Sequence, residues 1–239
     1  MNQNKTVFFI IGILLIVLGI SMLVPYFLQI FFNENSHSFL ASAFITIFFG
    51  ILFMLANLES EFKLNLQQTF LFSTLAWIFI AIFGSIPFML STVNFTISDA
   101  FFESMSGITT TGATVMTNLD DSPKSILIWR ALMQWLGGIG IVVMAITILP
   151  LLKVGGMQLF KMDGSHNTEK ILPRTFEVAT IIITTYFILT LSCSFLYWTF
   201  GMSIFDSIAH SMTTIATGGF STHNDSIGFF KNSNIEIIA

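Results

Sequence analysis

Two short stretches rich in threonine and glycine have the residue types to bind a cation: SGITTTGATV at 106–115 and TTIATGGFST at 213–222. Glycine permits backbone conformations that a Cβ atom would forbid, so successive carbonyl oxygens can face one axis and replace the water shell of a cation. Threonine hydroxyls add oxygen ligands without a formal charge, which keeps binding weak enough for release. An anion pore would be expected to show arginine or lysine here, and neither turn contains one. The residue types therefore favour a pathway for a cation.

The composition of the whole chain is that of an integral membrane protein. Of its 239 residues 54% are hydrophobic and 9% are charged, with a mean hydropathy of +0.83, whereas a soluble domain carries about 25% charged residues. The single cysteine, Cys193, excludes a disulfide within the chain. Because there is no basic patch, nucleic acid is not an expected partner. The expected surroundings are a lipid bilayer.

Five segments are long enough to cross that bilayer, because a spanning helix needs about 20 apolar residues. They are 6–32, 38–58, 69–92, 126–152 and 178–205. Lysine and arginine gather on the cytoplasmic side of membrane proteins. A cytoplasmic N-terminus would place most of the nine here inside: Lys5, Lys63, Lys153, Lys161, Lys170 and Arg174. We therefore expect the N-terminus and the basic connector 153–174 in the cytoplasm.

Each threonine- and glycine-rich turn follows a segment that is too short to span, residues 98–108 and 206–216. About 11 residues of helix measure roughly 16 Å, which is about half the hydrocarbon thickness. Ser98 or Asp99 is suited to cap the first helix and Asp206 the second, and the helix dipoles would aim negative charge at the turns. A half-length helix followed by irregular backbone predicts a re-entrant loop, which needs protein or a water-filled cavity around it.

The two loops align without a gap at an offset of 107 residues (210 minus 103), ESMSGITTTGAT at 103–114 with HSMTTIATGGFS at 210–221. The identical pairs are Asp99 with Asp206, Ser104 with Ser211, Met105 with Met212, Ile108 with Ile215, Thr110 with Thr217 and Gly112 with Gly219. This alignment predicts a repeated unit of membrane helix, half helix, turn and second membrane helix. The alternative is a chance match, because serine, threonine and glycine are common in loops.

Other polar residues show no pattern of catalysis. No nucleophile lies beside a base, and His210 on the second half helix is expected to pack or hydrogen-bond locally rather than to move protons. The remaining histidines have no metal-ligand spacing: His37, His166 and His223. Three acidic residues near the turns would either concentrate cations or be ordinary solvated residues: Asp120, Asp121 and Asp225. We expect no enzyme activity and no covalent cofactor.

Arg130 is the one charged residue inside the predicted span 126–152, where a charge needs a partner or a route to the interface. It would either extend to the outer surface along its aliphatic stem or pair with Glu103 on the first half helix and clamp the loop. Three glycines follow it, and they would either permit close helix packing, the usual use of small residues in membranes, or form a gating hinge. They are Gly137, Gly138 and Gly140.

Five motifs, with their flanking spans, cover nearly the whole chain: FFESMSGITTTGATV (101–115), WRALMQWLGGIGIVV (129–143), GGMQLFK (155–161), LPRT (172–175) and ATGGFSTHNDSIG (216–228). They resemble the Trk/Ktr/HKT superfamily of potassium transporters, and within it the membrane subunits of bacterial Trk systems. The resemblance implies an all-α integral membrane protein, with two N-terminal helices and four helix–pore-loop–helix repeats around a pseudo-fourfold ion pathway. This chain would hold the N-terminal helices and two of the four repeats.

The resemblance also divides the chain. Residues 1–65 would form the two-helix extension, 66–152 the first repeat, 153–174 a cytoplasmic connector, and 175–239 a second repeat truncated before its last helix. Because two repeats cannot close a fourfold ring, the chain is expected to be a fragment of a longer protein rather than one of two copies that pair.

A potassium filter would lie in the two loops. Its residues would be Thr110, Thr111, Gly112, Ala113, Thr217, Gly218, Gly219 and Phe220, with potassium bound through Thr110, Thr111, Thr217 and Gly218. The family's filter glycine aligns with Gly219 in the second loop, and a shift to Gly218 stays open. Glycine at 112 favours potassium, since a serine there is associated with sodium preference in related plant transporters.

The function that the resemblance implies is potassium uptake across the bacterial inner membrane, with potassium as the transported ion. It further implies a cytoplasmic nucleotide-binding regulatory subunit, docking near 153–174, and a homodimer of the full-length protein. One alternative is a secondary cation symporter, which would use broken helices in inverted repeats. The other is a non-conducting, truncated membrane fragment.

Overall fold

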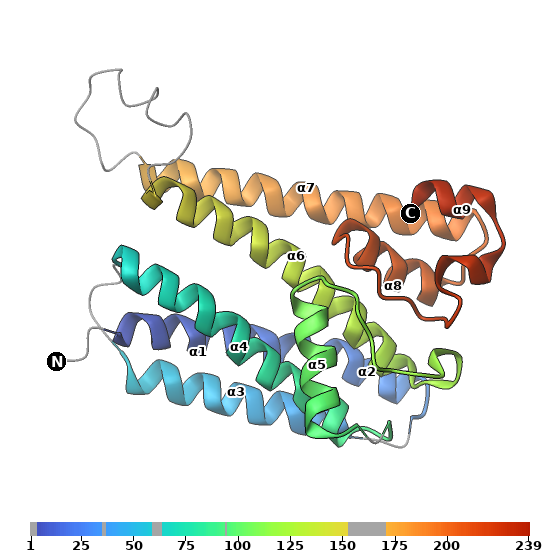
Figure 1. Cartoon of the computed structure of the whole chain (residues 1–239), viewed down its shortest axis with the longest axis horizontal. Coiled ribbons are helices and arrows are strands. Elements are labelled where there is room, and N and C mark those ends of the chain that lie inside the picture. The colour runs from blue at the N-terminus through green and yellow to red at the C-terminus, as the bar shows by residue number, and fades with distance from the viewer. Residues whose placement is uncertain (1–3, 35–36, 59–63, 94, 153–170) are drawn as a thin grey trace.

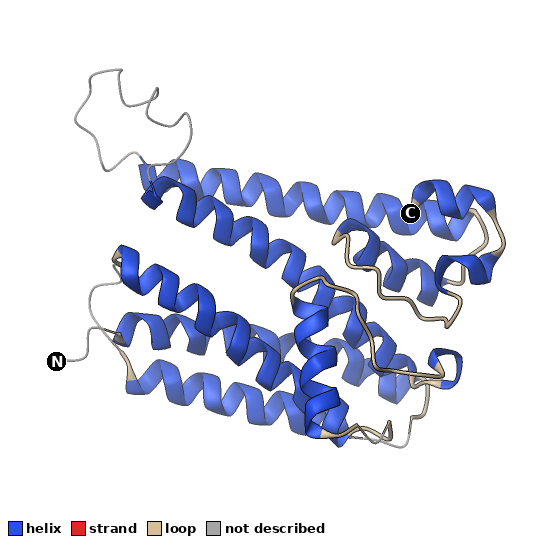
Figure 2. Ribbon diagram, viewed as in Figure 1, coloured by secondary structure: helices blue, strands red, loops and turns tan. Residues whose placement is uncertain are grey.

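The computed structural model describes residues 4–34, 37–58, 64–93, 95–152 and 171–239, with backbone only for 143, 145–152 and 171–176. Regular structure in these residues is helical throughout, without a strand (Figure 2). Five helices are long and apolar enough to cross a membrane: Lys5–Phe31, Ser38–Ala56, Leu66–Leu90, Lys124–Val142 and Glu177–Thr199. The predicted all-α membrane class is confirmed. Residues 153–170 of the predicted connector lie outside the described residues.

The first span consists of two successive helices, α1 (Lys5–Ser21) and α2 (Leu23–Phe31). Pro25 lies in the first turn of α2, and its missing N–H removes the bond that would reach back to the carbonyl of Ser21. Met22 at the junction keeps right-handed helical dihedrals, with φ of −65° and ψ of −16°. The break is therefore local.

Helix α3 (Ser38–Ala56) packs against α1 through glycines on both helices. A Cβ atom on Gly12 would lie 2.7 Å from the carbonyl oxygen of Gly50, and one on Gly50 would lie 2.8 Å from that of Gly12. Small residues commonly allow such close approach between membrane helices. Helix α4 (Leu66–Leu90) joins this group, and α1, α3 and α4 run side by side in Figure 1.

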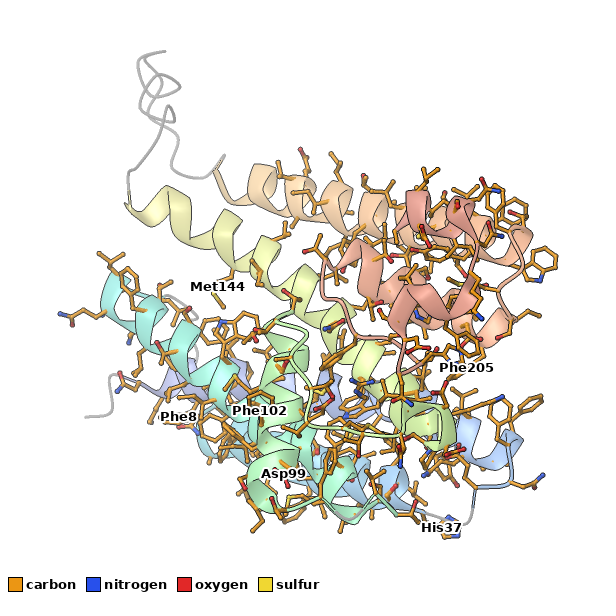
Figure 3. The ribbon with its side chains drawn as sticks, turned by 45° about the vertical axis from the view of Figure 1, so that its right-hand side comes forward. Phe8, His37, Asp99, Phe102, Met144 and Phe205 are labelled. Atoms are coloured by element: carbon orange, nitrogen blue, oxygen red, sulfur yellow. The ribbon has the colours of Figure 1, made fainter. Side chains whose placement is uncertain are left out.

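The half helices are α5 (Ile97–Ile108) and α8 (Ile204–Ile215), each of 12 residues and so about 18 Å long. Their first and last residues differ by the same 107 positions (204 minus 97 and 215 minus 108) that align the two loops in sequence. Helix α6 (Lys124–Leu152) runs between α5 and α8 and contacts both, while α7 (Ile171–Thr199) packs against α8 (Figures 1 and 3).

The caps of the half helices lie earlier than predicted. Thr96 caps α5 and Ser203 caps α8, since their hydroxyl oxygens accept the backbone N–H of Asp99 and Asp206, respectively. The prediction that Ser98 or Asp99 caps the first helix and Asp206 the second is therefore wrong. Both aspartates lie in the first turn, where their carboxylates accept a bond from the capping hydroxyl and face the positive end of the dipole.

Helix α7 ends at Thr199, before the predicted end of this span at 205. Gly201, with a φ of +105°, forms the left-handed turn that commonly ends a helix. The amide of Met202 closes this turn on the carbonyl oxygen of Tyr197 at 3.1 Å. Three short elements complete the described chain: 3₁₀ helices η1 (Leu119–Asp121) and η4 (Ser226–Phe230), and helix α9 (Ser233–Ile238).

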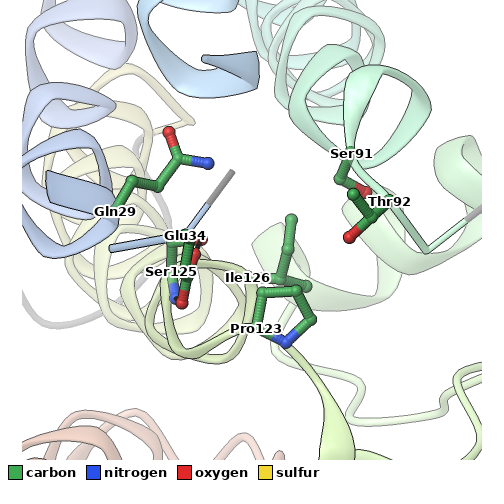
Figure 4. Close-up of a pocket in the computed structure, with 7 residues that line it drawn as sticks. All are labelled: Gln29, Glu34, Ser91, Thr92, Pro123, Ser125 and Ile126. Carbon is green, nitrogen blue, oxygen red and sulfur yellow. Dashed lines mark hydrogen bonds between the residues drawn. The ribbon is translucent and has the colours of Figure 1, made fainter. Parts of the chain in front are cut away.

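A small cavity lies between the ends of α2 and α4 and the start of α6 (Figure 4). Its volume is about 30 Å³, which is room for a single water molecule. Beside it, the Glu34 carboxylate accepts hydrogen bonds from the amide and hydroxyl of Ser125 in the first turn of α6, where the helix dipole favours an anion. We therefore interpret this cavity as a packing gap at the start of α6, and not as part of the loops described below.

Candidate functional site

Irregular backbone follows each half helix. We call residues 109–116 the first loop and residues 216–223 the second loop. Four of the eight predicted filter residues are exposed: Thr111, Ala113, Thr217 and Gly219. Both loops lie at the C-terminal end of a helix, where the dipole adds negative potential that favours a cation.

The two loops have matching backbone conformations. Thr110 and Thr217 have φ of +57° and +52°, and Gly112 and Gly219 have φ of +78° and +80°. Positive φ is a rare conformation for a β-branched residue such as threonine. Two unrelated loops would not be expected to share it at aligned positions. The backbone pairs Gly112 with Gly219 and not with Gly218.

The same side-chain contact ties each loop to its half helix. The hydroxyl of Thr114 donates to Oε1 of Glu103 at 2.8 Å, and Nε2 of His210 lies 3.0 Å from the hydroxyl of Ser221. These two pairs also correspond at the offset of 107 residues. Nδ1 of His210 lies 2.9 Å from the carbonyl oxygen of Asp206, so both ring nitrogens of His210 have local hydrogen-bond partners.

Arg130 of α6 forms a buried ion pair with Glu103 of α5. Its Nε lies 2.7 Å from Oε1 of Glu103, and the two side chains are 1% and 0% exposed. The alternative that Arg130 extends to the outer surface is therefore wrong. Because both charges are buried, each depends on the other for compensation of its lost hydration.

The same guanidinium connects the two loops. Nη2 of Arg130 donates to the hydroxyl of Thr114 in the first loop at 3.1 Å, and Nη1 donates to the carbonyl oxygen of Ser221 in the second loop at 2.9 Å. Its Cζ lies 4.1 Å from the ring centroid of Phe220, a cation–π geometry. One side chain of α6 thus holds both loops.

Gln134 is a second anchor, one helical turn after Arg130. Its Nε2 donates to the carbonyl oxygen of Gly218 at 2.8 Å, and its Oε1 accepts the amide N–H of Phe220 at 3.1 Å. The side chain is fully buried. The sequence prediction missed this residue. The available signal was a polar side chain four positions after Arg130, on the same face of a helix in an apolar span.

The backbones of the two loops meet at Gly112 and Gly218. A Cβ atom on Gly112 would lie 2.0 Å from the carbonyl oxygen of Gly218, whereas one on Gly219 would meet nothing within 4 Å. Position 112 therefore needs glycine for both space and backbone conformation. Position 219 needs it for conformation alone.

The glycines of α6 permit close packing at two of three positions. A Cβ atom on Gly137 would lie 1.9 Å from the carbonyl oxygen of Ile108 at the end of α5, and one on Gly138 would lie 2.6 Å from the hydroxyl of Tyr186 in α7. A Cβ atom on Gly140 would meet nothing within 4 Å. The packing interpretation holds for Gly137 and Gly138 and does not apply to Gly140.

Asp120 links the turns that lie beyond the two loops. Its carboxylate accepts hydrogen bonds from Nδ1 of His223 and Nδ2 of Asn224, each at 2.6 Å. The hydrogen bond from His223 is the main reason why the pKa of Asp120 is below its ordinary value of 3.8. All three acidic residues are exposed, and the side chain of Asp120 is 41% exposed, so this link between residues 103 and 104 positions apart lies at the surface.

The loops would meet a cation with carbonyl and hydroxyl oxygens, which suit a weakly held monovalent ion. The carboxylate of Glu103, close behind the first loop, is engaged by Arg130. Among the residues that the structure describes, no group of three or more His, Cys, Asp or Glu side chains could hold a metal ion.

Comparison with known proteins places these features in a family. The family model described as "TrkH: Cation transport protein" matches residues 35–239. The chain is 39% identical to the Trk system potassium uptake protein TrkH of Vibrio parahaemolyticus over 99% of its length, and 40% identical to that of Escherichia coli over 96%. The crystal structure of the potassium transporter TrkH from Vibrio parahaemolyticus superposes with a TM-score of 0.88 at 37% identity. It is matched over 99% of this chain and 48% of that one. The chain spans about half the length of the curated relatives that it matches, 50% and 48% for these two.

Proposed function

Because the chain belongs to the TrkH family of cation transport proteins, we propose that it forms half of a pathway for potassium uptake across a bacterial inner membrane. The proposal rests mainly on one observation: the two loops have the same backbone conformation, and side chains of α6 bind both of them. Relatives at 39% and 40% identity are potassium uptake proteins by name. Potassium is the transported ion in this proposal, and the protein has no catalytic role.

The loops supply the filter in this proposal. Thr110, Thr111, Gly112 and Ala113 contribute one quarter of it, and residues 217–220 contribute another. Positive φ at the paired threonines and glycines turns the peptide units in a way that ordinary loops do not. Unusual backbone held by surrounding contacts is typical of functional sites, and here Arg130 and Gln134 provide those contacts.

The proposal includes an arrangement in the membrane, which is supported by the resemblance of the sequence to this family. The proposed units are the extension 1–65, the repeats 66–152 and 175–239, and the connector 153–174, with the N-terminus in the cytoplasm. A cytoplasmic nucleotide-binding subunit would dock near the basic connector, and the full-length protein would be a homodimer. A symporter of inverted repeats is not favoured, because the two loops repeat in the same chain direction with the same contacts.

Growth of a bacterium that lacks its own potassium uptake systems tests the proposal. The chain is produced alone and joined to the second half of the Vibrio parahaemolyticus relative, with the amount in the membrane measured in both cases. We expect the joined protein to restore growth at limiting potassium and the chain alone to fail. Absence of growth with a joined protein that reaches the membrane would refute the proposed function. Growth with the chain alone would show instead that two copies pair.

A further inference from the structure

We propose that Gln134 is a positioning residue that decides which oxygens of the second loop face the ion pathway. This proposal rests on the proposed function, because it concerns the ligands of the same loops. It is carried by two hydrogen bonds, the burial of the glutamine and a difference between the two loops.

The primary amide of Gln134 binds the backbone on both sides of Gly219. Its Nε2 donates to the carbonyl oxygen of Gly218 at 2.8 Å, and its Oε1 accepts the N–H of Phe220 at 3.1 Å. The side chain is fully buried, so water does not compete for these bonds. Such an amide fixes the direction of both peptide groups at once.

The first consequence concerns the carbonyl oxygen of Gly218. It points to α6, and Gly218 itself is buried, while Thr217 and Gly219 on either side are exposed. This oxygen accepts the amide of Gln134 on one side and lies against Gly112 of the first loop on the other, so we infer that it is not free to bind an ion. The resemblance implies Gly218 as a potassium ligand; we infer instead that the second loop offers the oxygens of Thr217 and Gly219.

The second consequence explains why the loops differ in sequence. Gly218 of the second loop corresponds to Thr111 of the first at the offset of 107 residues. A Cβ atom on Gly218 would lie 2.3 Å from the amide carbon of Gln134, so a side chain at this position would displace the Gln134 amide from its two hydrogen bonds. Thr111, in contrast, is exposed, and its hydroxyl lies 2.8 Å from that of Thr109. The amide of Gln134 therefore fills the space that a side chain at position 218, equivalent to that of Thr111 in the first loop, would need.

Arg130 makes the neighbouring contacts on the same face of α6. It holds the carbonyl of Ser221 and stacks on Phe220, so the two side chains together fix residues 218–221. Among the side chains that the structure describes, Gln134 is the one that binds the peptide groups directly beside Gly219. Changing Gln134 should therefore alter ion preference, whereas changing Arg130 should also affect folding through the buried charge of Glu103.

The test compares Gln134→Leu and Gln134→Glu with a control, Gln29→Leu, in the joined protein described above. Gln29 is also a buried glutamine, but its amide donates to Ser38, far from the loops. Two quantities are measured: the ratio of potassium to sodium uptake, and amide hydrogen exchange of the segment 216–222 in the purified protein. Exchange reports the Phe220 N–H whether or not ions are transported.

Gln134→Leu removes both hydrogen bonds. We expect exchange in 216–222 to rise, and the potassium-to-sodium ratio to fall, by about fivefold or more each, since a single lost hydrogen bond accounts for about fivefold. For Gln134→Glu the ratio should recover as the pH is lowered, because a protonated carboxyl can again donate to Gly218 and accept from Phe220. Gln29→Leu should change neither quantity.

Unchanged exchange in Gln134→Leu would overturn the placement of Gln134, and faster exchange with an unchanged uptake ratio would overturn its role in ion preference. If the unmutated joined protein transports no potassium, the proposed function fails. Hydrogen exchange in the same samples then still decides whether Gln134 holds the loop.

Discussion

Nη1 of Arg130, on α6, donates to the carbonyl oxygen of Ser221, in the second loop, at 2.9 Å. The two residues are 91 positions apart in sequence. Together with the ion pair to Glu103 and the two bonds of Gln134, this contact shows that the second loop is held by a helix far from it in the sequence. Helix α6 sets the position of one loop relative to the other.

The first prediction concerns the pair of Arg130 and Glu103. Replacing either one with glutamine leaves a buried charge without its partner, which costs about 3–5 kcal/mol. The double variant should lose less than the sum, with a coupling of about 1–3 kcal/mol between the two positions. Thermal unfolding of the four purified proteins measures this, and potassium uptake is followed in parallel. Strictly additive losses would argue against a direct pair.

The second prediction separates the two loop glycines. Gly112→Ala places a methyl group 2.0 Å from the carbonyl oxygen of Gly218, so we expect uptake to be abolished. Gly219→Ala meets nothing within 4 Å and costs only the left-handed backbone conformation, about 1–2 kcal/mol. This variant should keep part of its potassium uptake, measured at equal amounts in the membrane. Equal losses in the two variants would contradict the close contact at Gly112.

The third prediction concerns packing of α6 on the end of α5. Gly137→Ala would place a Cβ atom 1.9 Å from the carbonyl oxygen of Ile108, and overpacking of this kind costs about 1–3 kcal/mol. We expect a lower melting temperature and weaker uptake, since Ile108 directly precedes the first loop. Gly140→Ala, on the same helix with nothing within 4 Å, serves as the control. A melting temperature for Gly137→Ala equal to that of this control would show that the helices separate freely.

The fourth prediction is a pH dependence at Asp120. The pKa of this carboxyl is lowered below 3.8 in the folded protein, chiefly by His223, so ionised Asp120 stabilises the fold. Its contribution is fully present above pH 3.8, the ordinary value, and is lost as the pH falls through the lower folded pKa. The melting temperature of Asp120→Asn should thus lie below that of the unmutated protein at neutral pH, and the difference should vanish in strong acid. A difference in melting temperature that stays constant down to strong acid would contradict this role of Asp120.

Several features of the fold could be predicted because they depend on short-range properties of the chain. The length of each apolar segment predicted the membrane helices, and the short segments 98–108 and 206–216 predicted two half helices. The structure contains them as α5 and α8, whose bounds differ by the same 107 positions that align the loops. The caps were harder, because Thr96, Ser98 and Asp99 are all good capping residues within four positions. Only the backbone dihedrals show that α5 begins after Thr96.

The sequence by itself determined that this is an all-helical membrane chain with two related loops. The length of the apolar segments and the repeated loop motif can be read without knowledge of any tertiary contact. The tertiary structure alone decided that Gln134 of α6 binds Gly218 of the second loop, and that Arg130 is buried rather than exposed. These contacts join residues 84 and 91 positions apart. They arise because α6 packs between the half helices, so its polar side chains find hydrogen-bond partners on neighbouring loops rather than in their own helix.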